Sequence, residues 1–133
     1  MTDGSAIRVL VVDDEQAIRE SITQFLLDFD FSVMNAANGE EALTLVRETP
    51  FDIAIVDMRL PEMTGDTFIL KAHQIDAHLK FLVLTGSIDY GPSPDLSKIG
   101  IGAENILKKP LFSLFNLVKR IEETLGEKNG PSL

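Results

Sequence analysis

Charged and hydroxyl side chains follow four of the five apolar segments that the sequence predicts as strands. Asp13 and Asp14 follow the first segment, Asp57 the third, Thr85 the fourth and Lys109 the fifth. Taken alone, each has an ordinary explanation, because aspartates and threonines often cap helices or start turns and lysines are usually solvated surface charges. Taken together they are more specific, because the carboxyl ends of parallel strands lie at one edge of a sheet, where ligands bind.

A cluster of three carboxylates requires a compensating positive charge. Two carboxylates about 5 Å apart repel each other by roughly 3 kcal/mol at an effective dielectric constant of about 20. Three of them with one lysine leave a local charge of about −2, which Mg²⁺, a hard cation that prefers oxygen ligands, would neutralise. Such a site suits phosphoryl transfer. One carboxylate would act as nucleophile and form an acyl phosphate, while Thr85 donates a hydrogen bond to one phosphoryl oxygen and Lys109 pairs with another.

The segments that carry these residues alternate between strands and helices. Apolar and β-branched runs predict strands at Ile7–Val12, Phe31–Asn35, Phe51–Val56, Lys80–Leu84 and Glu104–Leu107. Apolar residues at helical spacing predict helices at about 15–28, 38–49, 65–77 and 111–125. Between residues 87 and 102, three glycines and two prolines leave room only for a shortened or irregular helix. This order predicts an α/β fold with a doubly wound, five-stranded parallel sheet covered on both faces.

The composition fits one globular domain and excludes several kinds of chemistry. The 133 residues suit a single domain with a core of its own. The chain has no cysteine, which rules out disulfides, thiolate metal sites and cysteine nucleophiles. No apolar run approaches the roughly 20 residues that span a membrane, and the first residues lack the pattern of a signal peptide, so we expect a cytoplasmic protein. The net charge of −9 disfavours direct binding of nucleic acid by this domain.

Four short motifs occur in order along the chain: VLVVDDE, IVDMRLPEMTG, LVLTGS and LKKP. Together they resemble the response-regulator receiver domain of two-component signalling (CheY-like) over about residues 6–125. The resemblance implies a flavodoxin-like sheet of strand order 2-1-3-4-5, with a receiver domain at 1–126 and a flexible tail or linker stub at 127–133. It also implies a signalling switch, and not an enzyme, that takes phosphate from a sensor histidine kinase or a phosphotransfer protein. The output protein or output domain stays unknown.

The resemblance assigns the carboxylates and one backbone group to phosphorylation and metal binding. Asp57 matches the phosphoacceptor of the family. Asp14 matches the residue that binds Mg²⁺ directly, and Asp13 matches the one that supports the ion through water. The backbone carbonyl of Arg59 matches a further metal ligand. The resemblance therefore implies Mg²⁺ as the cofactor.

The resemblance also covers the switch, where the sequence departs from the family in two places. Thr85 matches the switch hydroxyl and Lys109 the phosphate-binding lysine, which Pro110, at the position of the family's cis proline, would aim inward. Three residues before Lys109 the family usually has an aromatic residue, whereas this chain has Ile106. The segment 86–102 leaves little room for the usual fourth helix. We therefore expect phosphorylation to reorder this segment instead of rotating a ring at position 106.

Two other functions stay open. Haloacid-dehalogenase-like phosphatases also use a strand-end aspartate, a threonine or serine, a lysine and Mg²⁺, but they require a second acid two residues after the nucleophile, where this chain has Arg59. A receiver-like interaction module that is not phosphorylated would agree with Ile106 and the irregular 86–102 segment, although the intact acidic cluster argues against it. The chain has no room for an output domain, so we expect it either to act alone or to form part of a longer protein.

Overall fold

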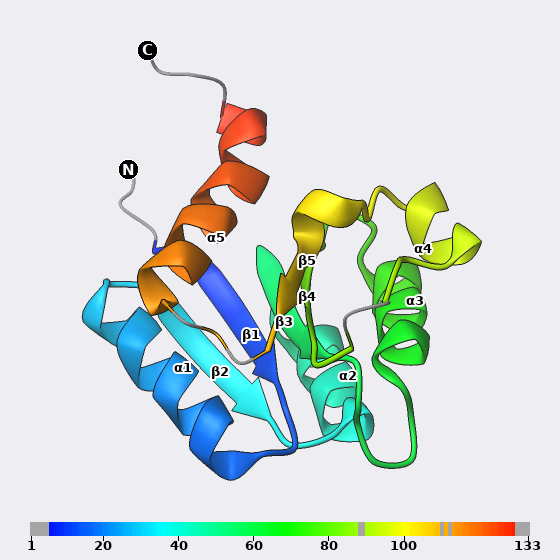
Figure 1. Ribbon diagram of the computed structural model, residues 1–133, viewed down its shortest axis with the longest axis horizontal. Coiled ribbons are helices and arrows are strands. Elements are labelled where there is room, and N and C mark those ends of the chain that lie inside the picture. The colour runs from blue at the N-terminus through cyan, green and yellow to red at the C-terminus, as the bar shows by residue number, and fades with distance from the viewer. Residues whose placement is uncertain (1–5, 88–89, 110, 112, 130–133) are drawn as a thin grey trace.

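The computed structural model describes residues 6–87, 90–109, 111 and 113–129, in which strands and helices alternate (Figure 1). The strands are β1 (Arg8–Val12), β2 (Ser32–Ala36), β3 (Ile53–Asp57), β4 (Lys80–Thr85) and β5 (Ile106–Lys108). The helices are α1 (Gln16–Asp28), α2 (Gly39–Glu48), α3 (Gly65–Ile75), α4 (Pro94–Lys98) and α5 (Leu114–Asn129), with a 3-10 turn, η1 (Ala103–Asn105). Within these ranges, no helix combines the length and the apolarity needed to cross a bilayer.

The five strands form one parallel sheet in the order β2-β1-β3-β4-β5, which confirms the predicted topology. Their pairing brings the carboxyl ends of the central strands level with one another. The aligned pairs at this edge are Val12–Val56, Asp57–Leu84 and Thr85–Lys108. The residues that follow β1 and β5 therefore leave the sheet at the edge where β3 and β4 end.

Helices cover both faces of the sheet, because alternate residues of each strand point to opposite sides. Helices α2, α3 and α4 pack on one face, and α1 and α5 pack on the other (Figure 1). The fully buried strand residues on the first face include Leu10, Val12, Ala54, Val56 and Val83, and those on the second include Val9, Val11, Ile53, Ile55, Leu82 and Leu84. Each of the valine, leucine and isoleucine side chains contributes roughly 1.5–3 kcal/mol through burial, so the two layers fix the strands and the residues at their ends.

The short helix before β5 confirms the predicted irregularity of this region. Helix α4 has only five residues, and the Ser93 side chain caps its start by accepting a hydrogen bond from the Leu96 amide (3.3 Å). Pro94 occupies the first turn, where its missing N–H costs nothing. Gly100 then adopts a positive φ of 95°, which a glycine reaches without strain. Leu96 is fully buried and anchors the helix on the sheet.

Two predicted boundaries near the end of the chain need correction. Glu104 and Asn105, predicted as the start of the fifth strand, belong to η1, because the Asn105 side chain accepts a hydrogen bond from the Gly102 amide (2.9 Å) and closes a turn there. The last helix begins at Leu114, not at 111, and continues to Asn129. Residues 127–129 of the predicted tail are therefore helical, and the domain boundary at 126 stays a prediction.

Candidate functional site

Three aspartates meet at the carboxyl edge of the sheet. One carboxylate oxygen from each of Asp13, Asp14 and Asp57 lies within 4.8 Å of the other two. Asp13 is 0% exposed and Asp57 4% exposed, whereas Asp14 faces solvent. The group therefore holds two buried carboxylates and one that water can reach. The sequence prediction that these three side chains lie close together agrees with this geometry.

The turn after β1 holds Asp13 in a fixed position. Its Oδ1 atom accepts a hydrogen bond from the Glu15 amide (2.9 Å), and the Arg19 guanidinium donates to its backbone carbonyl (2.8 Å). Its buried Oδ2 atom accepts no hydrogen bond from the described residues. Burial raises the pKa of Asp13, and the charge of Asp57 adds to this, against the opposing effects of the Glu15 amide and Lys109. The fold thus keeps a carboxylate where its charged form is disfavoured.

The loop after β3 fixes Asp57 and brings a backbone segment beside it. The Arg59 amide donates a hydrogen bond to Asp57 Oδ1 (3.2 Å), so the Arg59 backbone lies next to this carboxylate. The Gly65 amide donates to the Met58 carbonyl (3.1 Å), which closes the loop at the start of α3. A Cβ atom on Gly65 would lie 2.7 Å from the Asp57 carbonyl oxygen, so only glycine permits this close return.

Lys109 brings the positive charge of the site. Its backbone amide donates to the Thr85 carbonyl (2.8 Å), which extends the β4–β5 pairing by one residue. Its Nζ atom lies 3.1 Å from Asp13 Oδ2, from Glu15 Oε1 and from Asp57 Oδ2. The contacts with Glu15 and Asp57 are hydrogen bonds, whereas the approach to Asp13 is an ion pair without hydrogen-bond alignment. Burial lowers the pKa of Lys109, but the bonds to Asp57 and Glu15 outweigh this and raise it, so the ammonium stays charged.

Thr85 lies at the same edge but outside this charged group. Its side chain is buried, and its hydroxyl accepts a hydrogen bond from the Ser87 amide (3.1 Å). It follows Leu84, the residue that pairs with Asp57 across the two strands. Ile106 is half-buried and packs against the core on the α2 and α3 face, as an inward aliphatic residue should. Pro110 lies outside the described residues.

Two residues at the site were missed by sequence reasoning. Glu15 pairs with Lys109, and Arg19 holds the backbone of Asp13. A signal was present for Glu15, because it directly follows the two aspartates at a strand end. Arg19 lies four residues after Glu15 on α1, and its amide donates to the Glu15 carbonyl (2.9 Å), so both belong to the turn that starts the helix.

A tyrosine links the segment after β4 to the start of α3. The Tyr90 hydroxyl donates a hydrogen bond to Asp66 Oδ1 (3.1 Å). Burial, together with the charge of Asp66, raises the pKa of Tyr90 to about 12. Asp66 directly follows Gly65, so this contact ties the segment that follows Thr85 to the loop that follows Asp57.

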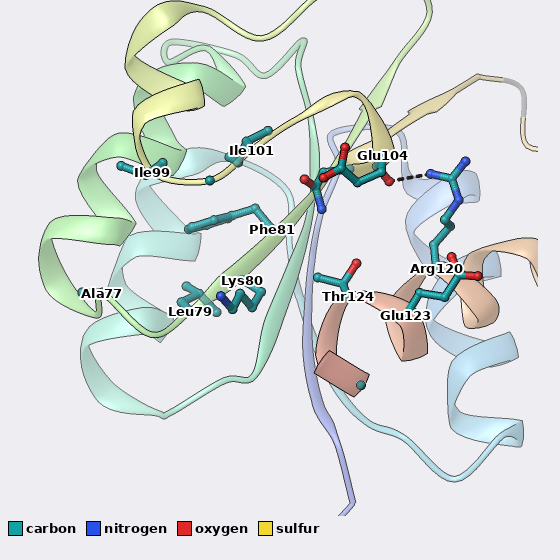
Figure 2. A pocket seen from close by; sticks show the side chains of 13 residues that line it. Ala77, Leu79, Lys80, Phe81, Ile99, Ile101, Glu104, Arg120, Glu123 and Thr124 are labelled. Carbon is teal, nitrogen blue, oxygen red and sulfur yellow. Dashed lines mark hydrogen bonds between the residues drawn. The ribbon is translucent and has the colours of Figure 1, made fainter. Parts of the chain in front are cut away.

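A hollow of about 910 Å³ lies away from the aspartates (Figure 2). Leu79, Phe81, Ile99 and Ile101 form its apolar side, and α5 contributes Arg120, Glu123 and Thr124 from across the gap. The Arg120 guanidinium donates a hydrogen bond to the Glu104 carbonyl (2.6 Å), drawn as the dashed line in Figure 2. Because β4 starts beside this hollow and ends beside the aspartates, the two lie at opposite ends of the sheet. The hollow is therefore no part of the charged site.

Comparisons with known proteins identify the family of most of the chain. Residues 9–122 match the family model described as response regulator receiver domain. The chain is 33% identical over 119 residues to response regulator MprA of Mycolicibacterium vanbaalenii, an alignment that covers 90% of this chain and 50% of MprA. It is 29% identical to the cell cycle response regulator CtrA of Brucella ovis, with 93% of this chain and 52% of CtrA covered. The chain thus spans about half the length of these curated relatives.

Solved structures extend this likeness to the fold. A CheY-like receiver domain protein from Methanospirillum hungatei JF-1 is 32% identical, with a TM-score of 0.80 and coverage of 95% of this chain and 100% of that one. The chemotaxis protein CheY4 of Vibrio cholerae is 30% identical, with a TM-score of 0.77 and coverage of 91% and 100%. Both comparisons cover more than nine-tenths of this chain.

Proposed function

Because the chain belongs to the response regulator receiver domain family, we propose that Asp57 accepts a phosphoryl group in a Mg²⁺-dependent reaction that switches a partner-binding surface. A receiver domain is a signalling switch and not an enzyme that turns over an outside substrate. One observation carries the proposal: the Lys109 ammonium lies 3.1 Å from the Asp57 carboxylate, beside two further aspartates. This arrangement holds a nucleophile and a phosphate-binding cation together at one sheet edge.

The donor set fits Mg²⁺. Asp13 Oδ2 is buried, accepts no hydrogen bond from the described residues and has only the Lys109 ammonium beside it as an ion pair at 3.1 Å, which leaves it able to bind a metal ion or an ordered water. The three aspartates supply hard oxygen ligands within 4.8 Å of one another, which suits Mg²⁺. We assign the ion to Asp13, Asp14 and Asp57 with the backbone carbonyl of Arg59. When bound, Mg²⁺ supplies charge neutralisation for the phosphoryl oxygens.

Four residues of the chain have different roles in the transfer of the phosphoryl group. A carboxylate oxygen of Asp57 attacks phosphorus, the new O–P bond forms, and the bond to the donor breaks with its electron pair leaving on the donor. Lys109 stays protonated and pairs with a phosphoryl oxygen. The Arg59 amide holds the other side of the Asp57 carboxylate. The Thr85 hydroxyl accepts a hydrogen bond from the Ser87 amide and can donate its own hydrogen to a phosphoryl oxygen.

A groove beside Lys109 supports a protein as the phosphodonor. It has a volume of about 340 Å³ and lies between α1 and the segment that leads into α5. Its lining is mostly apolar and includes Ile18, Leu111 and Leu114 together with Lys109 itself. We propose that a sensor histidine kinase or a phosphotransfer protein docks here, with its phosphohistidine directed at Asp57. The output partner is then contacted through surfaces that respond to the phosphoryl group.

Intact-mass analysis after incubation with acetyl phosphate and Mg²⁺ tests the proposal. The expected result is the addition of one phosphoryl group to the wild-type chain, and its loss in Asp57→Asn or when Mg²⁺ is chelated. Sustained hydrolysis of a generic phosphoester would instead indicate a phosphatase. Absence of any added group at every donor concentration would favour an interaction module that is not phosphorylated, the alternative that Ile106 and the short α4 keep open.

A further inference from the structure

The three carboxylate partners of Lys109 differ sharply in their access to water. All three oxygens lie 3.1 Å from Nζ, yet the Asp13 side chain is 0% exposed and that of Asp57 5%, whereas that of Glu15 is 60% exposed. The lysine side chain itself is only 15% exposed. A buried carboxylate that loses its cation stays desolvated, but an exposed one is rehydrated at once. Glu15 is therefore the partner that Lys109 can leave at the least cost.

A phosphoryl group at Asp57 would approach an ammonium that already has three carboxylate oxygens 3.1 Å away. Its ammonium now donates hydrogen bonds to Glu15 Oε1 and Asp57 Oδ2. An ammonium has three N–H groups, and a phosphoryl oxygen needs one of them. When the bond between a carboxylate oxygen of Asp57 and phosphorus forms, the donor leaves with the electron pair of its own bond to phosphorus. The added oxygens carry more negative charge than the single carboxylate did.

We propose that Glu15 is a positioning residue that holds Lys109 in the unphosphorylated state and competes with the incoming phosphoryl group for its ammonium. This inference rests on the function proposed above, because the competition exists only if Asp57 is phosphorylated. Glu15 fixes the ammonium over the acidic group at rest. Its carboxylate is the third negative group in contact with that ammonium. The phosphoryl group must displace this carboxylate to bind Lys109. Removing the side chain carboxylate should therefore make phosphorylation faster.

Among the described residues, the Glu15 side chain makes no hydrogen bond or ion pair other than that with Lys109. Glu15 precedes α1 at the N-cap position, but its side chain makes no cap hydrogen bond. What it contributes to the turn is its backbone amide, which binds Asp13 Oδ1 and is kept in every variant. Substitution at this position therefore tests the contact with Lys109 and not the integrity of the helix start.

The test compares two variants at position 15 with a matched charge control. The rate constant for phosphorylation by acetyl phosphate is measured at saturating Mg²⁺ for wild type, Glu15→Gln, Glu15→Asp and Glu20→Gln. Glu20 lies on the exposed surface of the same helix, where its carboxylate bonds only Gln16 among the described residues. Its variant therefore changes the net charge equally without touching Lys109.

We expect Glu15→Gln to be phosphorylated about three- to tenfold faster than wild type. The effect is modest because solvent and salt screen the contact between the exposed Glu15 carboxylate and Lys109. Glu15→Asp should gain at least half of this increase, because its shorter side chain keeps the charge but cannot reach Lys109. Glu20→Gln should stay at the wild-type rate. The advantage of Glu15→Gln should shrink as salt is raised, since salt weakens the exposed contact in wild type.

Three results would overturn the inference. One is a Glu15→Gln rate equal to or below that of wild type. A second is a Glu15→Asp rate equal to wild type beside a fast Glu15→Gln, which would show that charge alone matters and not contact with Lys109. The third is equal acceleration by Glu20→Gln. Failure of the proposed function looks different, because wild type itself would then take up no phosphoryl group.

Discussion

At the scale of single residues, burial separates aspartates that the sequence presents as equals. Asp13 is fully buried, and its Oδ2 atom has an ion pair with Lys109 but accepts no hydrogen bond from the described residues, whereas the adjacent Asp14 faces solvent. A buried carboxylate with an incomplete set of partners destabilises the fold. The raised pKa of Asp13 expresses this cost, since burial disfavours its charged form. The chain therefore keeps Asp13 for what it binds and not for what it adds to stability.

Asp13→Asn should increase the free energy of unfolding in the absence of divalent cations by about 1 kcal/mol at neutral pH, because Lys109 keeps Glu15 and Asp57 as partners. The sign follows from the pKa of Asp13, which is raised above its ordinary value of 3.8. An acid with a raised pKa favours the folded state below its ordinary pKa, and this contribution is lost as the pH rises through the folded-state pKa. The increase in the free energy of unfolding caused by Asp13→Asn should therefore be present at neutral pH and disappear below about pH 4. Urea unfolding at several pH values in EDTA measures it.

The control for this prediction is Asp14→Asn, which alters an exposed carboxylate of the same cluster. It should change the stability in EDTA by less than about 0.5 kcal/mol. Added Mg²⁺ should stabilise wild type and should stabilise both variants less, because a ligand that binds the folded state shifts the equilibrium toward it. A loss of stability in Asp13→Asn at neutral pH in EDTA would contradict the assignment.

Residue types at the strand ends were enough to find most of the charged group. Asp13, Asp14, Asp57 and Lys109 were all predicted to lie together, and the structure brings them together. The sequence could not rank the aspartates by burial, because exposure depends on how the loops of three strands close over the sheet. It also missed Glu15, although its place directly after the two aspartates puts it at the same strand end.

At the scale of elements, the loop between β3 and α3 depends on a glycine at one contact. Gly65→Ala would put a Cβ atom 2.7 Å from the Asp57 carbonyl oxygen and 2.9 Å from Met58 Cα, both of them backbone atoms that cannot move independently. We expect a loss of about 1–3 kcal/mol in the free energy of unfolding, together with slower phosphorylation because Asp57 shifts. Chemical denaturation and the acetyl phosphate assay measure the two effects.

Gly91→Ala provides the matched control, because a Cβ atom at Gly91 would meet nothing within 4 Å. Its stability should stay within about 0.5 kcal/mol of wild type. If Gly65→Ala and Gly91→Ala were equally stable and equally reactive, the close return of the loop would not be what positions Asp57.

The contact between Tyr90 and Asp66 offers a spectroscopic test of the segment after β4. Tyr90 is the only tyrosine and the chain has no tryptophan, so phenolate absorbance reports this residue alone. Its pKa is raised from 10.0 to about 12, so the stability that the neutral hydroxyl contributes is complete below pH 10 and is lost as the pH rises through about 12. We expect the folded protein to titrate near pH 12 and Asp66→Asn to titrate closer to 10.

Titration of wild type near pH 10 while far-UV circular dichroism still shows the folded state would contradict the Tyr90 contact.

The functional expectation for this segment is separate and stays a prediction: phosphorylation reorders residues 86–102. Tyr90 joins this segment to the first turn of α3, next to the Asp57 loop, through its hydrogen bond to Asp66. Amide exchange with and without a phosphoryl mimic would test it, and unchanged protection across the segment would refute it.

Element types were predictable from the sequence, and their ends were less so. Continuous apolar strands between amphipathic helices led to the correct order of elements and to the short α4. The predicted boundaries were wrong where the chain makes a turn that the sequence pattern does not indicate. At η1 the Asn105 side chain closes a 3-10 turn where a strand was predicted. The longer α5 was missed because Gly126 suggested a helix end, although a Cβ there would meet nothing and the helix passes through it.

At the scale of the whole molecule, topology makes the site. The strand order β2-β1-β3-β4-β5 places β1 and β3 side by side although a helix, a strand and another helix separate them in sequence. Asp13 and Asp57 are thereby brought together, and β4 and β5 add Thr85 and Lys109 from one side. This much followed from the pattern of strands and helices and from the family resemblance. The chain spans about half the length of these curated relatives.

The most direct test of the central claim is the location of the phosphoryl group. Wild-type protein is incubated with acetyl phosphate and Mg²⁺, an acyl phosphate is reduced with borohydride to the corresponding alcohol, and the peptides are sequenced by mass spectrometry. Position 57 should appear as homoserine in the complete reaction and as unchanged Asp57 when Mg²⁺ or the donor is omitted. Reduction at another carboxylate, or none anywhere under conditions that label the intact protein, would contradict it.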